Sequence, residues 1–439
     1  MKKILLKNSN IINNDATVDK NKDIYIENSR IVKIIDTNNF NLCCENVDNN
    51  DSCEIIDCST YYVSPGLVNL HSHAAMNIFK GIAEDVTIDD WFNKEIFPYE
   101  SKLQPEDIYN GVKLAILEML NNGVTAFADH YFGQESVLKA AMDSKIRIDL
   151  ASTIFGLAPN YKEQLQNAKE FISKNRNISS RVNLRLGPHA PYTCPGEILS
   201  EIVNTAKELN VGIHLHVSET KEQVDTSLDQ TKKTPFEVLY ESGGFDINTI
   251  VAHGLWVEEN DIKYLNDKTY FAFCPKTYMK LAMGEGNIYK YHDRINYSFG
   301  TDGGASSNTL NPLEQARLFA LNGKFINNDS ESFKIKDIWK HLMDGHKALA
   351  FNTGEIKEGK DADIIIWDLN RPNTFPIYNP VISILYSSNS ENVLYTMIEG
   401  EFIKYKGKLT LDEKEVLNNI SNVQSSILER GKGKSNVNY

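Results

Sequence analysis

The sequence lacks the features of membrane proteins and of proteins that bind nucleic acid. Its 439 residues include no apolar run of the roughly 18 residues that a membrane-spanning helix needs. The first residues, MKKILLKNSNIINN, turn polar after a very short apolar run, so we expect no signal peptide. Positive charge is scarce, because the 46 Lys and Arg residues are outnumbered by 59 Asp and Glu residues, which gives a formal net charge of −13. Such a chain repels phosphate backbones and anionic lipids, so we expect neither as a partner.

Cysteine is also sparse, and no two cysteines form a CxxC pair. A chain of this length can bury a large core without disulfides, so scattered cysteines favour a reducing compartment, and we expect a cytoplasmic protein. Four of the six lie in or beside the acidic, Asn-rich stretch 41–57. Their spacing matches no zinc pattern, so we interpret this stretch as a surface excursion rather than a metal site. The six are Cys43, Cys44, Cys53, Cys58, Cys194 and Cys274.

The pattern of apolar residues divides the chain into three parts. Short β-branched runs separated by Asn- and Asp-rich turns predict strands in 1–63, and similar runs return in 354–439. Between them, in 64–353, eight short apolar runs alternate with amphipathic stretches such as PEDIYNGVKLAILEMLNNG. Eight strand–helix units predict a closed (β/α)8 TIM barrel, in which catalytic groups lie at the C-terminal ends of the strands. The expected fold is therefore α/β: this barrel, with a small discontinuous β-sandwich domain formed by both chain termini.

His71-Ser72-His73 ends the first apolar run of the predicted barrel, LVNLHSH. Residues i and i+2 of a strand share a face, so both imidazoles point into the barrel mouth. Each can then give one nitrogen to the same divalent ion. By itself an HxH pair is equally well explained by two structural histidines, but its place at a strand end favours a metal site.

Three further polar groups follow at the predicted ends of later strands: His216 in HLHVSET, His253 in IVAHG and Asp302 in FGTDGGAS. His214 shares a face with His216 but lies farther from the mouth, so we expect a hydrogen-bonded structural role for it. Glu219 lies past the strand end, close enough to reach a substrate beside the metal. Three imidazoles and one carboxylate around an ion leave a position open for water, as catalysis requires.

The motifs PGLVNLHSH, HVSET, AHG and GTDGGAS, in this order, resemble the amidohydrolase superfamily. The fold of that family is a metal-bearing (β/α)8 barrel with a small β domain made from both chain ends. Within it, the sequence is similar to the 5-methylthioadenosine/S-adenosylhomocysteine deaminases, with triazine hydrolases as nearby relatives. The stretches that carry this similarity are HSHAAMNIFKGIAEDVTIDDWFNKEIFPYE, GPHAPYTCP, GTDGGASSNTLN and GEIKEGKDADIIIWDL.

The resemblance implies a metal-dependent aminohydrolase that deaminates an adenine-type nucleoside, a small-molecule substrate, and releases ammonia. It implies one divalent ion, zinc by expectation, with iron or manganese as alternatives. The implied catalytic residues are Asp302 and Glu219, which would transfer protons, and His253, which would orient the water; Glu219 and Asp302 would also contact the substrate. The implied metal ligands are His71, His73, His216 and Asp302.

Two more substrate contacts come from the resemblance alone. Glu100, in IFPYE, would bind the ribose hydroxyls, and His189, in GPHAPY, would contact the substrate. Without the family, Glu100 would be interpreted as a solvated acid at a helix start. The oligomeric state is left open, with a homo-oligomer as one option, because members of this family often form dimers or larger closed assemblies.

Two departures from the family bear on the substrate. Members that accept S-adenosylhomocysteine carry arginines in the stretch that here reads RIDLASTIFGLAPN, where this chain has Ser152 and no arginine between Arg147 and Arg176. A substrate carboxylate would lose its bidentate partner, so we expect a neutral 5′ substituent, as in 5′-methylthioadenosine, 5′-deoxyadenosine or adenosine.

The second departure is Tyr278, in TYMKL, which stands where the family has a small amide. It leaves guanine, triazine or pterin rings open as alternative substrates. A non-catalytic scaffold on the same fold is a further alternative, but such proteins usually lose metal ligands and this sequence retains them all.

Overall fold

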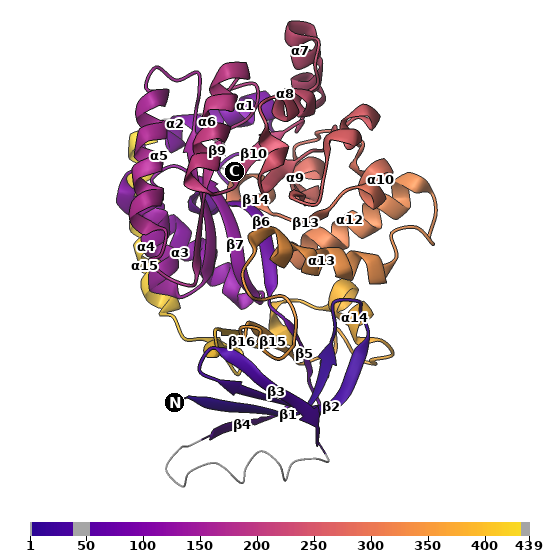
Figure 1. The fold of residues 1–439 in the computed structure, drawn as a ribbon. Helices are drawn as coiled ribbons and strands as arrows, with labels where there is room; N and C mark the ends of the chain where they lie inside the picture. Colours follow the sequence, from indigo (N-terminus) through magenta and orange to yellow (C-terminus); the bar gives the residue numbers. More distant parts are fainter. Residues whose placement is uncertain (1, 38–52, 432–439) are drawn as a thin grey trace.

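The computed structural model describes residues 2–37 and 53–431 (Figure 1). Residues 41–52, with Cys43 and Cys44, lie outside these residues, so their interpretation as a surface excursion stays a prediction. For 53–57 that interpretation is wrong, because Cys53–Asp57 is a strand that pairs with residues 3–7. No helix in the described part of the chain has both the length and the apolar content to cross a membrane.

All eight apolar runs predicted to build the barrel are parallel strands of one sheet. They pair in the order β13-β12-β11-β10-β9-β8-β7-β6, and the short strand β14 (Asp302–Gly303) pairs with β6. The strands are β6 (Leu67–His73), β7 (Val124–Tyr131), β8 (Arg147–Ile154), β9 (Val182–Pro188), β10 (Ile213–Val217), β11 (Thr249–His253), β12 (Thr269–Phe273) and β13 (Tyr297–Phe299).

Helices lie between the barrel strands, as the alternating pattern predicted. The longer ones are α3 (Pro105–Asn121), α4 (Gln134–Ser144), α5 (Tyr161–Asn175), α6 (Gly196–Leu209), α7 (Lys221–Thr231), α8 (Pro235–Glu241), α12 (Pro312–Asn327) and α13 (Ile335–Leu349). Shorter helical segments are η2 (Ala74–Phe79), α1 (Ile88–Asp90), η3 (Trp91–Ile96), α2 (Phe97–Glu100), η4 (Gly244–Asp246), η5 (Glu259–Tyr264), α9 (Pro275–Lys280), α10 (Ile288–Tyr291), η6 (His292–Arg294) and α11 (Gly304–Ser307).

The local sequence explains these elements. Every residue of β7, VTAFADHY, is buried, as expected for a parallel strand covered on both faces. In α6 the buried Leu199, Ile202, Val203 and Ala206 recur at helical spacing and form one apolar face. Asn210 ends this helix in the left-handed conformation that asparagine tolerates.

Strands from both chain ends form a second sheet, as predicted. Its order is β18-β17-β16-β15-β5-β1-β2-β3, and β4 pairs with β1. Figure 1 shows the indigo N-terminal strands beside the yellow C-terminal ones. The N-terminal strands are β1 (Lys3–Ile12), β2 (Val18–Glu27), β3 (Arg30–Asp36), β4 (Cys53–Asp57) and β5 (Tyr62–Pro65). The C-terminal strands are β15 (Ile364–Trp367), β16 (Val393–Ile398), β17 (Glu401–Tyr405) and β18 (Lys408–Leu409).

The last part of the chain is helical. Short segments α14 (Pro380–Ile382), η7 (Ser383–Ser387) and η8 (Ser390–Asn392) separate β15 from β16. The final helix, α15 (Glu413–Gly431), packs mainly against α3 and α2 of the barrel domain. The exact domain boundaries at 63 and 353 stay a prediction.

A buried ion cluster joins the barrel to the terminal sheet. Arg147, the first residue of β8, places Nε 2.7 Å from Asp363 Oδ2 and Nη2 3.0 Å from Asp361 Oδ2. Its Nη1 lies 3.3 Å from Glu399 Oε1. The side chains of Arg147 and Asp363 are almost fully buried, so the arginine neutralises carboxylates that water cannot reach.

Replacing this arginine should therefore destabilise the protein strongly. Because Arg147→Met leaves the buried carboxylate of Asp363 without its cationic partner, we expect the free energy of unfolding to fall by about 3–5 kcal/mol in urea denaturation. Arg294→Met, which removes an exposed ion pair with Glu259, is the control and should cost about 1 kcal/mol or less. Equal losses in the two variants would contradict the assigned role of Arg147.

Candidate active site

The ends of β6, β10 and β14 bring the four predicted metal ligands together. Asp302 Oδ1 lies 3.3 Å from His73 Nε2 and 3.7 Å from His71 Nε2. His216 Nε2 lies 3.2 Å from His73 Nε2. Four donor atoms from three separate strands therefore face a common point; we call these four residues the donor cluster.

Hydrogen bonds on the far side of each ring orient the histidines. His73 Nδ1–H donates to the carbonyl of His130 (2.6 Å), and His216 Nδ1–H donates to that of His189 (2.8 Å). The Nε2 lone pairs are then free to face the centre, an arrangement typical of metal-binding histidines. His71 Nε2 is buried and has no hydrogen-bond partner among the described residues. The cluster thus fits a divalent metal ion held by three nitrogens and one oxygen.

His214 lies one layer deeper, as the sequence predicted. It is fully buried, and its Nε2 is 2.9 Å from His71 Nδ1. When His71 Nε2 keeps its lone pair, Nδ1 carries the proton and donates to His214. This contact gives His71 the same kind of support that backbone carbonyls give the other two rings.

Burial keeps His71, His216 and His253 neutral. It lowers the pKa of His71 well below its ordinary value, and it lowers the pKa of His216 and of His253 to about 4. Near pH 7 these rings are therefore uncharged, and each has a lone pair available for a metal or a proton. His253 also belongs to this constellation, because one ring nitrogen lies within 4.8 Å of donor atoms of His71 and His216.

Asp302 is held in an unusual backbone conformation. Its φ of +59° is in the left-handed region, and so is the φ of +68° at His253, the last residue of β11. Residues other than glycine rarely adopt this backbone conformation, and those that do are often at functional sites. Asp302 Oδ2 accepts a 2.7 Å hydrogen bond from the Ser306 hydroxyl. Although burial opposes ionisation, His73, His253 and this hydroxyl hold the pKa of Asp302 below its usual value.

Glu219 lies beside the cluster. Its Oε1 is 3.5 Å from His253 Nε2, and its backbone N–H donates to Gln223 Oε1 in the first turn of α7. Burial raises the pKa of its carboxyl group. Raising this pKa brings the two protonation states closer in energy near neutral pH, which suits a residue that gives and takes a proton.

The two expected substrate contacts lie at the rim of the cluster. Glu100, the last residue of α2, accepts a 2.7 Å hydrogen bond from the hydroxyl of Tyr131, whose ring centre is 6.2 Å from that of His73. Glu100 is therefore not the solvated acid that the bare sequence suggested. The His189 ring centre lies 5.0 Å from that of His216, and His189 Nδ1 is 3.0 Å from Thr193 Oγ1.

His130 and Asp129, at the end of β7, also belong to the site, although the sequence motifs did not single them out. The His130 ring centre lies 5.0 Å from that of His216, and its Nδ1 is 3.1 Å from Thr153 Oγ1. Asp129 hydrogen-bonds Ser72, between the two ligands of β6. A sequence signal for these two residues was present. The run VTAFADHY, now β7, is one of the eight apolar runs of the predicted barrel, and its polar residues lie at its C-terminal end, as those of the other runs do.

Ser152, the residue found where arginine was expected, does not face the donor cluster. Thr153 Oγ1 reaches His130 inside the barrel, so the preceding Ser152 points to the opposite face of β8, away from the cluster. Each of the nine arginines in the sequence bonds protein groups outside the donor cluster. The absence of an arginine beside the cluster therefore holds for the described residues, although Ser152 is not the residue that shows it.

Tyr278, the other departure from the family, does line the site. Its hydroxyl oxygen accepts the backbone N–H of Cys274 (2.9 Å), and its ring centre is 5.7 Å from that of His253. The side chain is buried and lies against the His253 ring.

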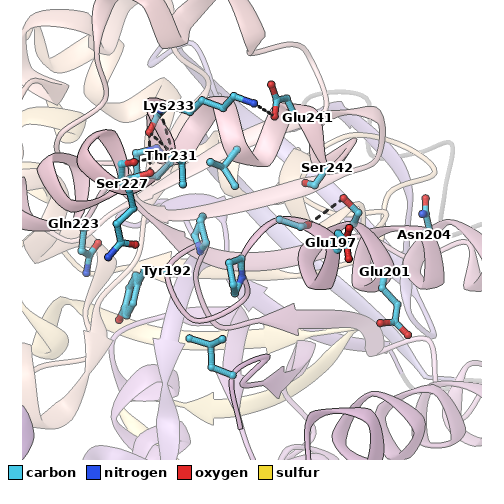
Figure 2. Close-up of a pocket in the computed structure, with 18 of the residues that line it drawn as sticks. Tyr192, Glu197, Glu201, Asn204, Gln223, Ser227, Thr231, Lys233, Glu241 and Ser242 are labelled. Carbon is cyan, nitrogen blue, oxygen red and sulfur yellow. Dashed lines mark hydrogen bonds and ion pairs between the residues drawn. The ribbon is translucent and has the colours of Figure 1, made fainter. Parts of the chain in front are cut away.

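A cavity of about 1010 Å³ opens between α6 and the pair α7–α8, next to this site (Figure 2). Its lining combines polar and apolar side chains and includes Tyr192, Gln223 and the buried Ser218, the residue before Glu219. None of the donor-cluster residues lines it. The candidate active site is therefore assigned from its converging donors rather than from the size of a cavity.

Known proteins resemble this chain along most of its length. The profile of the Amidohydrolase family matches residues 62–403. A 5'-deoxyadenosine deaminase of Methanosphaera stadtmanae is 36% identical, over 84% of this chain and 88% of its own. A 5-methylthioadenosine/S-adenosylhomocysteine deaminase of Dictyoglomus turgidum is 34% identical, over 94% of this chain and 96% of its own.

Solved structures show the same fold. An adenosine deaminase from Xanthomonas campestris with bound zinc has a TM-score of 0.90 at 24% identity, covering 97% of this chain and 98% of its own. An atrazine chlorohydrolase of Arthrobacter aurescens TC1 complexed with zinc has a TM-score of 0.84 at 20% identity, covering 96% and 100%. From the family match and these identities, together with the barrel and its strand-end histidines, the chain belongs to the amidohydrolase family.

Proposed function

We propose that the protein is a metal-dependent aminohydrolase that deaminates an adenine-type nucleoside. The observation that carries this proposal is the position of Glu219 and His253, 3.5 Å apart, beside the donor cluster. A metal site with a proton donor next to it is what hydrolytic removal of a ring amino group requires. Relatives about 35% identical to this chain carry the names of nucleoside deaminases, which supports the same substrate class.

His71, His73, His216 and Asp302 would hold one divalent ion, for which we propose zinc. When bound, the ion lowers the pKa of a coordinated water so that hydroxide is available near neutral pH. The nitrogen and carboxylate set suits zinc, and the solved adenosine deaminase and chlorohydrolase structures with this fold contain zinc.

The residues around the ion would move the protons. Asp302 takes a proton from the attacking water, and His253 orients that water and stabilises the charge that develops on it. Glu219 protonates the ring nitrogen next to the attacked carbon, which makes this carbon electrophilic. The water oxygen becomes bonded to the carbon, and the proton held by Asp302 passes to the amino group. The carbon–nitrogen bond then breaks, ammonia leaves, and the proton that remains on the former water oxygen passes to Glu219, which restores its acid form and leaves a ring carbonyl.

Glu100 and His189 would hold the rest of the nucleoside. Glu100, with one oxygen already bonded to Tyr131, has the other available for ribose hydroxyls. Because no arginine contacts the donor cluster among the described residues, we propose a neutral 5′ substituent. This favours 5′-deoxyadenosine, 5′-methylthioadenosine or adenosine over S-adenosylhomocysteine.

We also propose that the enzyme works in the cytoplasm. Among the described residues none of the cysteines forms a disulfide, which is consistent with a reducing compartment.

A substrate panel tests the reaction and its specificity. Purified protein should release ammonia from 5′-deoxyadenosine, 5′-methylthioadenosine and adenosine, and more slowly from S-adenosylhomocysteine, whose carboxylate lacks a partner. A coupled ammonia assay measures all four, with guanine, a triazine and a pterin beside them. Comparable rates for S-adenosylhomocysteine would contradict the neutral 5′ substituent. Release only from the other rings would replace the nucleoside proposal.

The role of Glu219 is tested by Glu219→Gln. The amide cannot cycle a proton, so kcat should fall by about 10²–10⁴-fold, while bound metal stays at the parent level. Glu222→Gln, three residues along on the exposed face of α7, is the matched control and should keep parent kcat. An unchanged kcat in Glu219→Gln would remove Glu219 from the mechanism.

The metal site is tested by His216→Ala. We expect elemental analysis to find about one metal ion per parent chain, and a substoichiometric amount in the variant, because one of the nitrogen donors is gone. His341→Ala, a histidine that stacks on Tyr297 away from the cluster, should bind metal as the parent does. A parent protein without stoichiometric metal would favour the non-catalytic scaffold.

A further inference from the structure

A buried carboxylate lies behind the two metal-ligand histidines of β6. Asp129, near the end of β7, is paired in register with Ser72 of β6. Its Oδ1 accepts a 2.9 Å hydrogen bond from the Ser72 hydroxyl and a 2.7 Å hydrogen bond from the backbone N–H of Ala74. One oxygen thus binds the residue before His73 and the residue after it.

The direction of the side chains separates this contact from the donor cluster. His71 and His73 point into the barrel, so Ser72 between them points to the opposite face of β6. Likewise, His130 points into the barrel, and Asp129 before it points away. Asp129 therefore acts on the ligands through the backbone of β6, without touching a metal ion or a substrate.

The next residue of β7 completes the support of His73. The His130 carbonyl accepts the Nδ1–H of His73, which sets the rotation of that ring. Asp129 fixes the backbone on both sides of His73, and His130 fixes its imidazole. The end of β7 therefore positions both the backbone and the ring of His73.

The chemistry of Asp129 is also unusual for a purely structural residue. It is buried, and Oδ2 has no hydrogen-bond partner among the described residues. The groups that bond Oδ1, a hydroxyl and a backbone amide, are neutral and do not offset the cost of a buried carboxylate. A divalent ion held by His71 and His73 on the other side of the strand would offset it.

We propose that Asp129 is a positioning residue for the metal centre, which holds the His71–His73 segment in its binding geometry and adds a negative charge behind the ion. This inference rests on the proposed metal ligands, but not on the identity of the substrate. Groups that orient metal ligands in this way typically contribute about 10–100-fold to metal affinity.

The test measures metal binding without any substrate. Asp129→Ala should bind zinc about 10–100-fold more weakly than the parent in competition with a chelator. It should also change the visible absorption of the cobalt-substituted protein, because the ligand geometry is altered. Asp129→Asn, which keeps an oxygen acceptor but loses the charge, should give a smaller loss, and it keeps the test available if the alanine variant does not fold.

Asp149→Asn is the control for general destabilisation. Asp149 is a buried carboxylate on the neighbouring strand β8, but it is paired with Arg185 (2.6 Å) and not with the β6 ligands. This variant should lower the melting temperature and keep the zinc affinity and cobalt spectrum of the parent. Parent-like zinc affinity in both Asp129 variants would overturn the inference, and so would an equal loss in Asp149→Asn. Protein that binds zinc with the expected pattern but deaminates no nucleoside would overturn only the proposed reaction.

Discussion

The site depends on the hydrogen bonds that close the barrel between the last strands and the first. The backbone N–H of Thr301 donates to the carbonyl of His71 (2.8 Å) and to Asn69 Oδ1 (3.0 Å). The preceding Gly300 passes so close that a Cβ there would be 2.7 Å from His71 Cβ. Through this contact the chain returns to β6 after more than two hundred residues, and Asp302 arrives beside His71 already facing the histidines.

Closure also explains the electrostatics of the site. Several imidazoles and carboxylates are excluded from water within one barrel mouth, where charges of like sign would repel strongly. Burial resolves this by lowering the pKa of His71, His216 and His253, which leaves these rings uncharged near pH 7. The pKa of Asp302 is below its usual value, and the Ser306 hydroxyl donates a hydrogen bond to its carboxylate. The arginines are used elsewhere, as with Arg147 at the opposite end of β8. The site is therefore suited to a cation and to a substrate without negative charge.

Much of this architecture could be predicted because it depends on local pattern. The eight apolar runs predicted eight strands, and the polar residues at their ends predicted where His71, His73, His216 and Asp302 would meet. Terminal strands that could not bury a face alone were expected to combine, and they do. Glu100 could not be placed from pattern, because its environment comes from Tyr131 on a different element.

By itself, the sequence determined the order of the strands, the residues at their ends and the family, since strand alternation and motif spacing are properties of the chain. Only the tertiary structure decided how those ends are oriented. Three features depend on the register between neighbouring strands: the face of β8 to which Ser152 points, the carbonyl that accepts the hydrogen bond of His216, and the contact of Asp129 with Ser72. Register is set by the packing of the whole barrel, and a shift of one residue would turn each of these side chains to the other face.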